Sequence, residues 1–348
     1  MEQPDTGQLS VELFRQESLR YEKVSYPARR GVLHRLSDGE LDLWFRLNGQ
    51  LKYLSGRPPA WQRPWEWLKL TLGDDWIYYS AGDYQGLYEL CGEHYLQCPE
   101  YARYHPLGER PFAEGWVAGA RKKALELLEG LEKAAAGAGG DIAKLYSIVA
   151  GRGPSFDWGR SLHGIIGGTI PVLPPDCRHV DYDVVPLVLA DGCRYGCRFC
   201  CLGTKRPFSV RSKSRILHQI EGLKAMLGEE LGNHLGLFVG QEDALAAGWE
   251  RFTEAASEAL ERLGLGRGNM KGEPSVFAFA SVGALLECTE RGWRHLNRLP
   301  ARLYLNVGLE AAGAEALGVL GKPLRPATVD AAFCRAVDIN RHYANVEV

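Results

Sequence analysis

The feature that most constrains the fold of this chain is the alternation of short apolar runs with amphipathic segments after residue 184. The amphipathic segments carry apolar residues three or four positions apart, which indicates helices. Each run between them is almost wholly apolar, which is typical of a parallel strand covered on both faces. Helices between the runs would supply the crossovers that parallel strands need. The runs are residues 184–190, 235–239, 276–280, 303–307 and 345–348.

Four helices are expected between these runs, near residues 216–227, 249–263, 283–298 and 329–337. We therefore predict an α/β fold for residues 184–348, as an open parallel sheet or a barrel. In both arrangements ligands bind at the carboxyl ends of the strands. The chain ends inside its fifth run, at Val348. Because a bare last strand leaves an exposed edge, we expect the sheet to be incomplete at its C-terminus and the sequence to be a fragment.

The first 110 residues are rich in aromatic side chains and have a different character. Asn48-Gly49 separates two strand-like runs, 41–47 and 50–54, which predicts a hairpin with positive φ at both turn residues. A further strand is expected at 75–80. The Trp-rich segment 61–67 favours a small packed core, with a substrate platform as the alternative. We expect residues 1–110 to form an α+β accessory domain.

Residues 111–183 read as a connecting region. A helix is predicted at 113–136 from its apolar spacing, followed by a flexible Ala/Gly linker. A second helix is expected at 141–150 with Asp141 as its N-cap. The Gly- and Pro-rich stretch 151–180 predicts irregular structure.

Composition excludes several classes of protein. The chain has 348 residues, of which 45% are hydrophobic and 24% charged, so a mostly disordered chain is excluded and two domains are expected. No run of 18 uncharged apolar residues is present, so no membrane span is expected. The acidic N-terminus does not resemble a signal peptide, and the net charge of −2 does not indicate nucleic-acid binding. We expect a cytoplasmic protein.

Nine cysteines are present, and four of them fall within nine residues. Such clustering is typical of metal ligands rather than of a disulfide framework. Cys193, Cys197 and Cys200 have the spacing C-x3-C-x2-C, directly after the first apolar run. An electron-transfer [4Fe–4S] cluster takes four cysteines, so three would leave one iron open. A zinc site is the alternative, although the paired C-x2-C knuckles of zinc ribbons are missing. Cys201 reads as a neighbour of the site.

This motif, placed after the first strand of a parallel β/α unit, resembles the radical S-adenosylmethionine (radical SAM) superfamily. Phe199, the aromatic residue before the last cysteine, agrees with the family pattern. The resemblance covers about residues 184–348 and identifies no subfamily. It implies a partial (β/α) barrel, a [4Fe–4S] cluster and S-adenosylmethionine (SAM) bound at the open iron. It further implies reductive cleavage of SAM to methionine and a 5′-deoxyadenosyl radical that attacks a substrate not identified by the sequence.

Residues after the later strands resemble the SAM contacts of that family. The family's Gly-Gly-Glu is matched by Gly240 and Glu242, while Gln241 departs from it. The fourth strand ends in Gly-Leu-Glu, at Glu310, and Lys322 resembles a basic residue that follows this strand. The resemblance implies that the SAM-binding residues are Phe199, Gly240, Glu242, Ser281 and Glu310. The alternative for the two acids is a solvated strand end.

Seven basic residues, uninterrupted by an acid, surround the cysteines: Arg194, Arg198, Lys205, Arg206, Arg211, Lys213 and Arg215. This run favours a solvated face, a docking surface for an acidic electron donor such as flavodoxin or ferredoxin, or a phosphate site. The alternative to a radical SAM enzyme is a non-catalytic protein in which zinc or an iron–sulfur cluster has a structural role.

Overall fold

The computed structural model describes residues 9–17, 31–57, 61, 66–70, 72–73, 76–80, 92–96, 115–150, 157–168, 184–200, 207–240, 242–270 and 272–348. The chain divides into two compact units, which are described separately. Unit 1 consists mainly of residues 28–162, and unit 2 mainly of residues 163–226 and 231–348. Among the described residues, no helix combines the length and hydrophobicity that crossing a bilayer requires.

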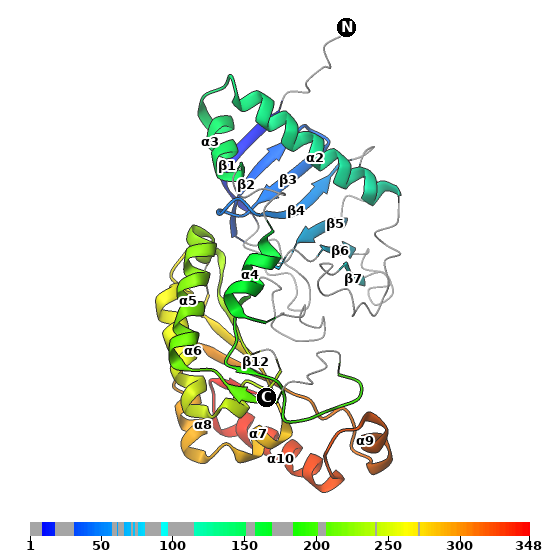
Figure 1. The fold of residues 1–348 in the computed structure, drawn as a ribbon, viewed down its shortest axis with the longest axis vertical. Helices are drawn as coiled ribbons and strands as arrows, with labels where there is room; N and C mark the ends of the chain where they lie inside the picture. The colour runs from blue at the N-terminus through cyan, green and yellow to red at the C-terminus, as the bar shows by residue number, and fades with distance from the viewer. Residues whose placement is uncertain are drawn as a thin grey trace. The chain divides into compact units, whose positions relative to one another are not determined.

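Unit 1 is built on a seven-stranded antiparallel sheet whose strands lie in chain order. This sheet is consistent with the predicted N-terminal α+β part (Figure 1). The strands are β1 (Ser10–Glu17), β2 (Gly31–Ser37), β3 (Leu41–Phe45), β4 (Leu51–Gly56), β5 (Glu66–Leu70), β6 (Trp76–Ser80) and β7 (Gly92–Leu96).

The predicted hairpin around Asn48-Gly49 is confirmed, but its turn differs from the expected one. The N–H of Gly49 donates to the carbonyl of Arg46 at 2.9 Å. The N–H of Arg46 donates to the carbonyl of Gln50 at 2.8 Å. Gly49 has a φ of +90°, whereas Asn48 is not among the residues with positive φ. These bonds define a three-residue loop, in which only the last residue needs the left-handed conformation.

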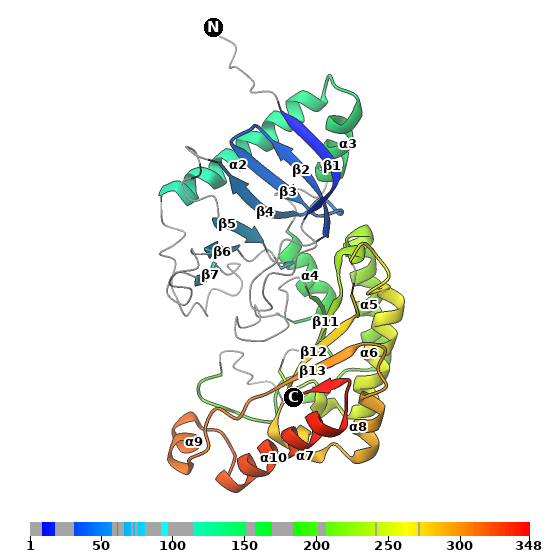
Figure 2. The ribbon, with the colours of Figure 1, turned by 180° about the vertical axis from the view of Figure 1, so that it is seen from behind.

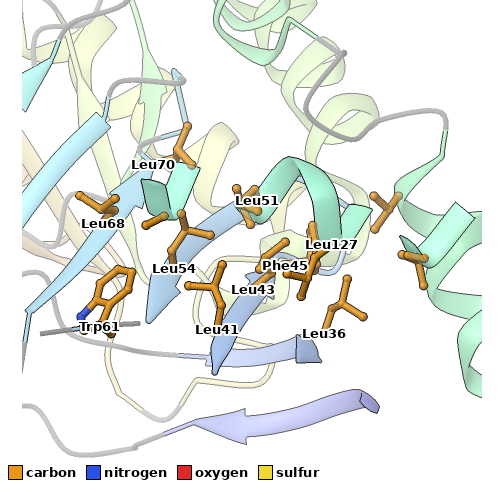
Figure 3. Packing of buried hydrophobic residues seen from close by; sticks show 14 of the residues in the cluster. Leu36, Leu41, Leu43, Phe45, Leu51, Leu54, Trp61, Leu68, Leu70 and Leu127 are labelled. Atoms are coloured by element: carbon orange, nitrogen blue, oxygen red, sulfur yellow. The ribbon is translucent and has the colours of Figure 1, made fainter. Parts of the chain in front are cut away.

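Two helices complete the core of unit 1, α2 (Gly115–Ala135) and α3 (Gly140–Val149). The buried side chains of α2 recur every three or four residues and pack with the leucines of the sheet (Figure 3). Trp61 is 1% exposed and belongs to the same cluster, so this tryptophan has the predicted packing role. The N-cap of α3 is Gly139 rather than Asp141, because the helix begins one residue earlier than predicted. Asp141 lies in the first turn, where the helix dipole favours a carboxylate.

Unit 2 contains the predicted parallel sheet. Its five strands lie in the order β14-β13-β12-β11-β8, and all neighbours are parallel. Helices α5 (Lys213–Leu227), α6 (Trp249–Leu263) and α8 (Glu290–Leu296) lie on one face of this sheet (Figures 1 and 2). The neighbours β8, β11, β12, β13 and β14 follow one another in chain order. The strands are β8 (Val185–Leu187), β11 (Gly236–Val239), β12 (Ser275–Ala280), β13 (Arg302–Val307) and β14 (Val346–Glu347).

Residues 157–348 differ from the prediction in three places. The expected helix 283–298 is two helices, because the hydroxyl of Thr289 accepts the N–H of Gly292 and starts a new one. Helix α9 was not predicted, and α4 (Trp158–Ile166) lies where irregular structure was expected. The helices are α5 (Lys213–Leu227), α6 (Trp249–Leu263), α7 (Val282–Glu287), α8 (Glu290–Leu296), α9 (Ala314–Leu320) and α10 (Pro326–His342).

Candidate functional site

The carboxyl ends of the parallel strands in unit 2 lie along one edge of the sheet. Each is followed by a segment that carries residues singled out in the sequence. The cysteines follow β8, and the segments after β11, β12 and β13 carry Glu242, Ser281 and Glu310. Because these strands are parallel neighbours, the structure brings the predicted residues to one rim, where ligands of such sheets bind.

The strand that leads to the cysteines is interrupted at Val188 and Leu189. The chain leaves the parallel sheet after β8 and enters a second, two-stranded sheet at β9 (Ala190–Asp191). Gln219, on α5 and only 1% exposed, binds both backbone groups of Val188 at this point. Its Oε1 accepts the Val188 N–H at 3.0 Å, and its Nε2 donates to the Val188 carbonyl at 3.0 Å. Both backbone groups of Val188 are therefore satisfied where the chain leaves the ladder.

The two-stranded sheet closes the base of the cysteine loop, residues 192–208. In it, β9 pairs with β10 (Ser209–Val210) in antiparallel register. Next to this pairing, the Arg211 guanidinium binds both carboxylate oxygens of Asp191, with Nε 3.0 Å from Oδ2. It also donates to the carbonyls of Ile166 and Gly167 at the end of α4. Bidentate arginine–carboxylate pairs fix orientation, so the two ends of the loop are held together.

The three thiols of the predicted motif lie on the described part of this loop. Cys193, Cys197 and Cys200 are free and half-buried. The N–H of Tyr195 donates to the Sγ of Cys193 at 3.3 Å, and the N–H of Cys200 donates to the carbonyl of Cys197 at 3.3 Å. Backbone N–H groups aimed at sulfur are among the interactions that tune iron–sulfur clusters. Cys201 lies outside the described residues.

Charged groups surround the thiols. Burial raises the pKa of the Cys193 thiol to about 11, and the carboxylates of Asp243 and Glu242 add to the rise, while the N–H of Tyr195 opposes it. Burial lowers the pKa of Lys322, and the three thiols act in the opposite direction.

The end of β11 lies close to the end of β8, the first strand of the parallel sheet. Gly240 has a φ of +94°, and its N–H donates to the carbonyl of Leu187 at 2.6 Å. A Cβ at this position would lie 2.5 Å from the Cβ of Ala244, so only glycine fits here. Glu242 follows, half-buried and close enough to Cys193 for its charge to act on the thiol. Gln241, the departure from the family pattern, lies outside the described residues.

Asp243 was not predicted as a site residue, although an acid within four residues of the end of β11 was a usable signal. Asp243 is 3% exposed, and its Oδ1 accepts the N–H of Ser281 at 2.9 Å. Ser281 is the N-cap of α7, and its hydroxyl accepts the N–H of Ala284 at 3.1 Å. The structure thus gives Ser281 a capping role, and its predicted contact with SAM stays a prediction.

Glu310 at the end of β13 is held by an ion pair. Its side chain is 30% exposed and contacts the ammonium of Lys322, which is itself buried and also donates to the carbonyl of Gly308. Glu310 has a φ of +56°, a conformation that non-glycine residues adopt rarely and often at functional sites. Lys322 is also close enough to the three thiols for their charges to act on its pKa.

The far side of the cysteine loop rests on α9. The N–H of Arg198 donates to the carbonyl of Leu320 at 2.9 Å, and the side chain of Arg198 packs against Gly321. Phe199, predicted to contact SAM, is 46% exposed. Its aromatic face is therefore available on the rim.

Most described members of the basic run are bound to acids of unit 2. Lys205 and Arg206 lie outside the described residues, and Arg198 packs as stated above. Four basic side chains thus share three carboxylates of the unit, because Asp191 binds both Arg211 and Arg215. The pairs are Arg194–Glu287 at 2.8 Å, Arg211–Asp191, Lys213–Glu254 and Arg215–Asp191 at 3.3 Å.

The donor set of the loop fits an iron–sulfur cluster. Three thiols lie on one loop with closed ends, one of them already bound by a backbone N–H. In the part of the chain that the structure describes, no three histidine, cysteine, aspartate or glutamate side chains converge as ligands of a metal ion.

Comparison with protein families and with curated proteins finds no match for this chain. Among solved structures, the chain is similar to TsrM from Kitasatospora setae, a radical SAM methyltransferase with cobalamin and a [4Fe–4S] cluster bound. The identity is 15% and the TM-score 0.33, and the match covers 49% of this chain and 32% of that chain. The chain thus spans about a third of the length of TsrM. A likeness at this level does not establish a shared fold or function.

Proposed function

We propose that unit 2 is the catalytic part of a radical SAM enzyme, in which Cys193, Cys197 and Cys200 hold a [4Fe–4S] cluster with one open iron. When bound, such a cluster supplies the electron for reductive cleavage of SAM. The substrate on which radical chemistry starts is not specified by the proposal. In this reading the parallel strands form a partial (β/α) barrel over residues 184–348, and residues 1–110 form the accessory domain, joined by 111–183.

One observation carries the proposal. Three thiols share a loop whose two ends are held together, and the same rim carries the half-buried Glu242, the buried Asp243 and the buried Lys322. The loop is closed by the β9–β10 pairing and by the Asp191–Arg211 ion pair. Functional sites need a supporting shell that fixes the first ligands before the metal arrives. A loop serving only as a connection would not need such support.

The chain's own residues have distinct roles in the proposal. Glu242 and Glu310 follow β11 and β13, which lie on either side of β12, and would accept N–H and O–H groups of SAM, with Gly240 permitting close approach. Phe199 would pack against the ligand through its exposed ring. Lys322 holds Glu310 in place.

The proposal also includes a partner and a compartment. Cleavage of SAM needs an electron, for which we propose a flavodoxin- or ferredoxin-like donor. Thiols that must stay reduced favour the cytoplasm.

The test is iron and sulfide content after anaerobic reconstitution of the full chain. We expect wild-type protein to bind one [4Fe–4S] cluster and Cys197→Ala to bind none. Cys334→Ala is the matched control, because Cys334 is an exposed cysteine on α10 and should leave the cluster unchanged. An intact cluster in Cys197→Ala would refute the ligand assignment, and bound zinc without sulfide would favour a structural metal centre.

A further inference from the structure

The first half of the cysteine loop is attached to α7 through Tyr195. This residue lies between Cys193 and Cys197, and its hydroxyl oxygen accepts the N–H of Gly283 at 2.8 Å. Gly283 is in the first turn of α7, where backbone N–H groups lack partners within the helix. The tyrosine therefore supplies a partner for the helix while it fixes the loop.

The attachment point on α7 is itself fixed. The carboxylate of Asp243 accepts the N–H of Ser281, the N-cap of this helix, at 2.9 Å. Asp243 is 3% exposed, so this bond is shielded from water. A chain of contacts thus runs from the end of β11, through the start of α7, to the loop.

A neighbouring arginine strengthens the same attachment. Arg194 donates to the carboxylate of Glu287 at 2.8 Å and to the carbonyl of Ala246 at 3.1 Å. Glu287 is the last residue of α7, so two consecutive loop residues contact the two ends of one short helix. The loop segment between the first two cysteines cannot rotate without breaking these bonds.

The space at Gly283 is matched to the tyrosine. A Cβ at this position would lie 3.1 Å from the hydroxyl oxygen of Tyr195, closer than ordinary side-chain contacts. Glycine within a helix is unfavourable relative to alanine, and here it leaves room for the hydroxyl. Helix α7 thus has a residue of low helix propensity at the position that binds the loop.

We propose that Tyr195 is a positioning residue, whose hydroxyl on the first turn of α7 sets the orientation of Cys193 and Cys197 before any cofactor is present. The effect of Tyr195 on the thiols is independent of the proposed function. The effect of Tyr195 on cofactor binding rests on the proposed function. The residue acts through the loop backbone and touches neither thiol with its hydroxyl.

The first experiment measures alkylation rates of Cys193 and Cys197 by iodoacetamide in the metal-free full chain, resolved by peptide mass spectrometry. Tyr195→Phe removes the hydroxyl, and Gly283→Ala displaces it while favouring the helix. We expect labelling to be roughly tenfold faster in both variants, the scale of one hydrogen bond to a buried donor. Labelling of both variants at the wild-type rate would overturn the proposal.

Two controls match the perturbations. Tyr343→Phe removes a hydroxyl that donates to Glu290 at 2.6 Å, away from the loop, and Gly318→Ala adds a methyl group to a short helix where space is open. Both should label at the wild-type rate. Equal acceleration in the controls would show a general loosening of unit 2 and would refute a specific role for Tyr195.

The second experiment uses reconstituted protein. Tyr195→Phe should retain iron, yet the electron paramagnetic resonance spectrum of its reduced cluster should respond differently to SAM than that of wild type. An identical response would limit Tyr195 to the metal-free loop and overturn the cofactor part of the proposal. A wild-type chain that takes up no cluster would refute the proposed function, and the labelling rates would still decide the role of Tyr195.

Discussion

Replacing Arg211 with methionine should release the base of the cysteine loop. The Arg211 side chain is 1% exposed and binds Asp191 and two carbonyls at the end of α4. Methionine has a similar length but donates no hydrogen bond, so Arg211→Met leaves the Asp191 carboxylate and the carbonyls without this partner. The change removes the interaction with little loss of volume.

The size of the effect follows from burial. Breaking a buried ion pair by removing one partner costs about 3–5 kcal/mol. The Asp191 side chain is 20% exposed and keeps Arg215 at 3.3 Å, so the lower end of that range applies. A loss of ~3 kcal/mol corresponds to a fall in Tm of roughly 6–12 °C for a domain of this size. Arg215→Met is the control, because its 53% exposed side chain makes a surface pair worth less than about 1 kcal/mol.

The assay combines thermal unfolding with hydrogen exchange. Because the chain has two units, a single unfolding transition is not assured, and exchange reports on the loop base directly. The N–H of Arg211 bonds to the carbonyl of Leu189 at 2.9 Å, so its protection should fall in Arg211→Met and persist in Arg215→Met. Equal protection and equal Tm in the two variants would refute the reasoning that the buried pair closes the loop.

Three further outcomes are expected. Gly49→Ala should destabilise unit 1 by more than about 2 kcal/mol, because it adds left-handed strain and a Cβ 2.4 Å from the Ile148 carbonyl oxygen. Gly39→Ala, at a position with positive φ but open space, should lower the stability of unit 1 by less. Equal losses of stability in the two variants would contradict the steric argument. Hydrogen bonds from Tyr343 and Arg335 lower the pKa of Glu290 from 4.5, so its stabilisation should be fully present above pH 4.5 and be lost progressively as the pH falls below that value. A Tm difference between wild type and Glu290→Gln that does not shrink on acidification below pH 4.5 would contradict this assignment. Glu242→Gln should weaken SAM binding by roughly 1–3 kcal/mol, measured by equilibrium dialysis on reconstituted protein, and unchanged affinity would remove Glu242 from the site.

The sequence predicted the parallel sheet of unit 2 well, because continuous apolar runs and helical spacing are local signals of burial. It also located the cysteines after the first strand. Two-residue strands such as β9 and β10 have no periodicity of their own, so the closed base of the loop was not visible. Helix α9 has only Leu317 buried, which leaves too little apolar pattern to identify it.

The supporting contacts of the site depend on tertiary approach. The Asp243–Ser281 bond joins residues 38 apart, and the Tyr195–Gly283 bond joins residues 88 apart. Neither spacing is encoded in a local motif. The hairpin turn was mispredicted for a different reason: Asn48-Gly49 suits a two-residue loop, but Leu47 joins it here, and only Gly49 takes positive φ.

The measurement that tests the central claim most directly is chromatography of products from reconstituted, dithionite-reduced full chain incubated anaerobically with SAM. The account predicts methionine and 5′-deoxyadenosine in wild type, and neither in Cys193→Ala, Cys197→Ala or Cys200→Ala. Cys334→Ala, whose exposed thiol lies on α10, should retain both products. An intact cluster in wild-type protein without any 5′-deoxyadenosine would contradict a radical SAM function.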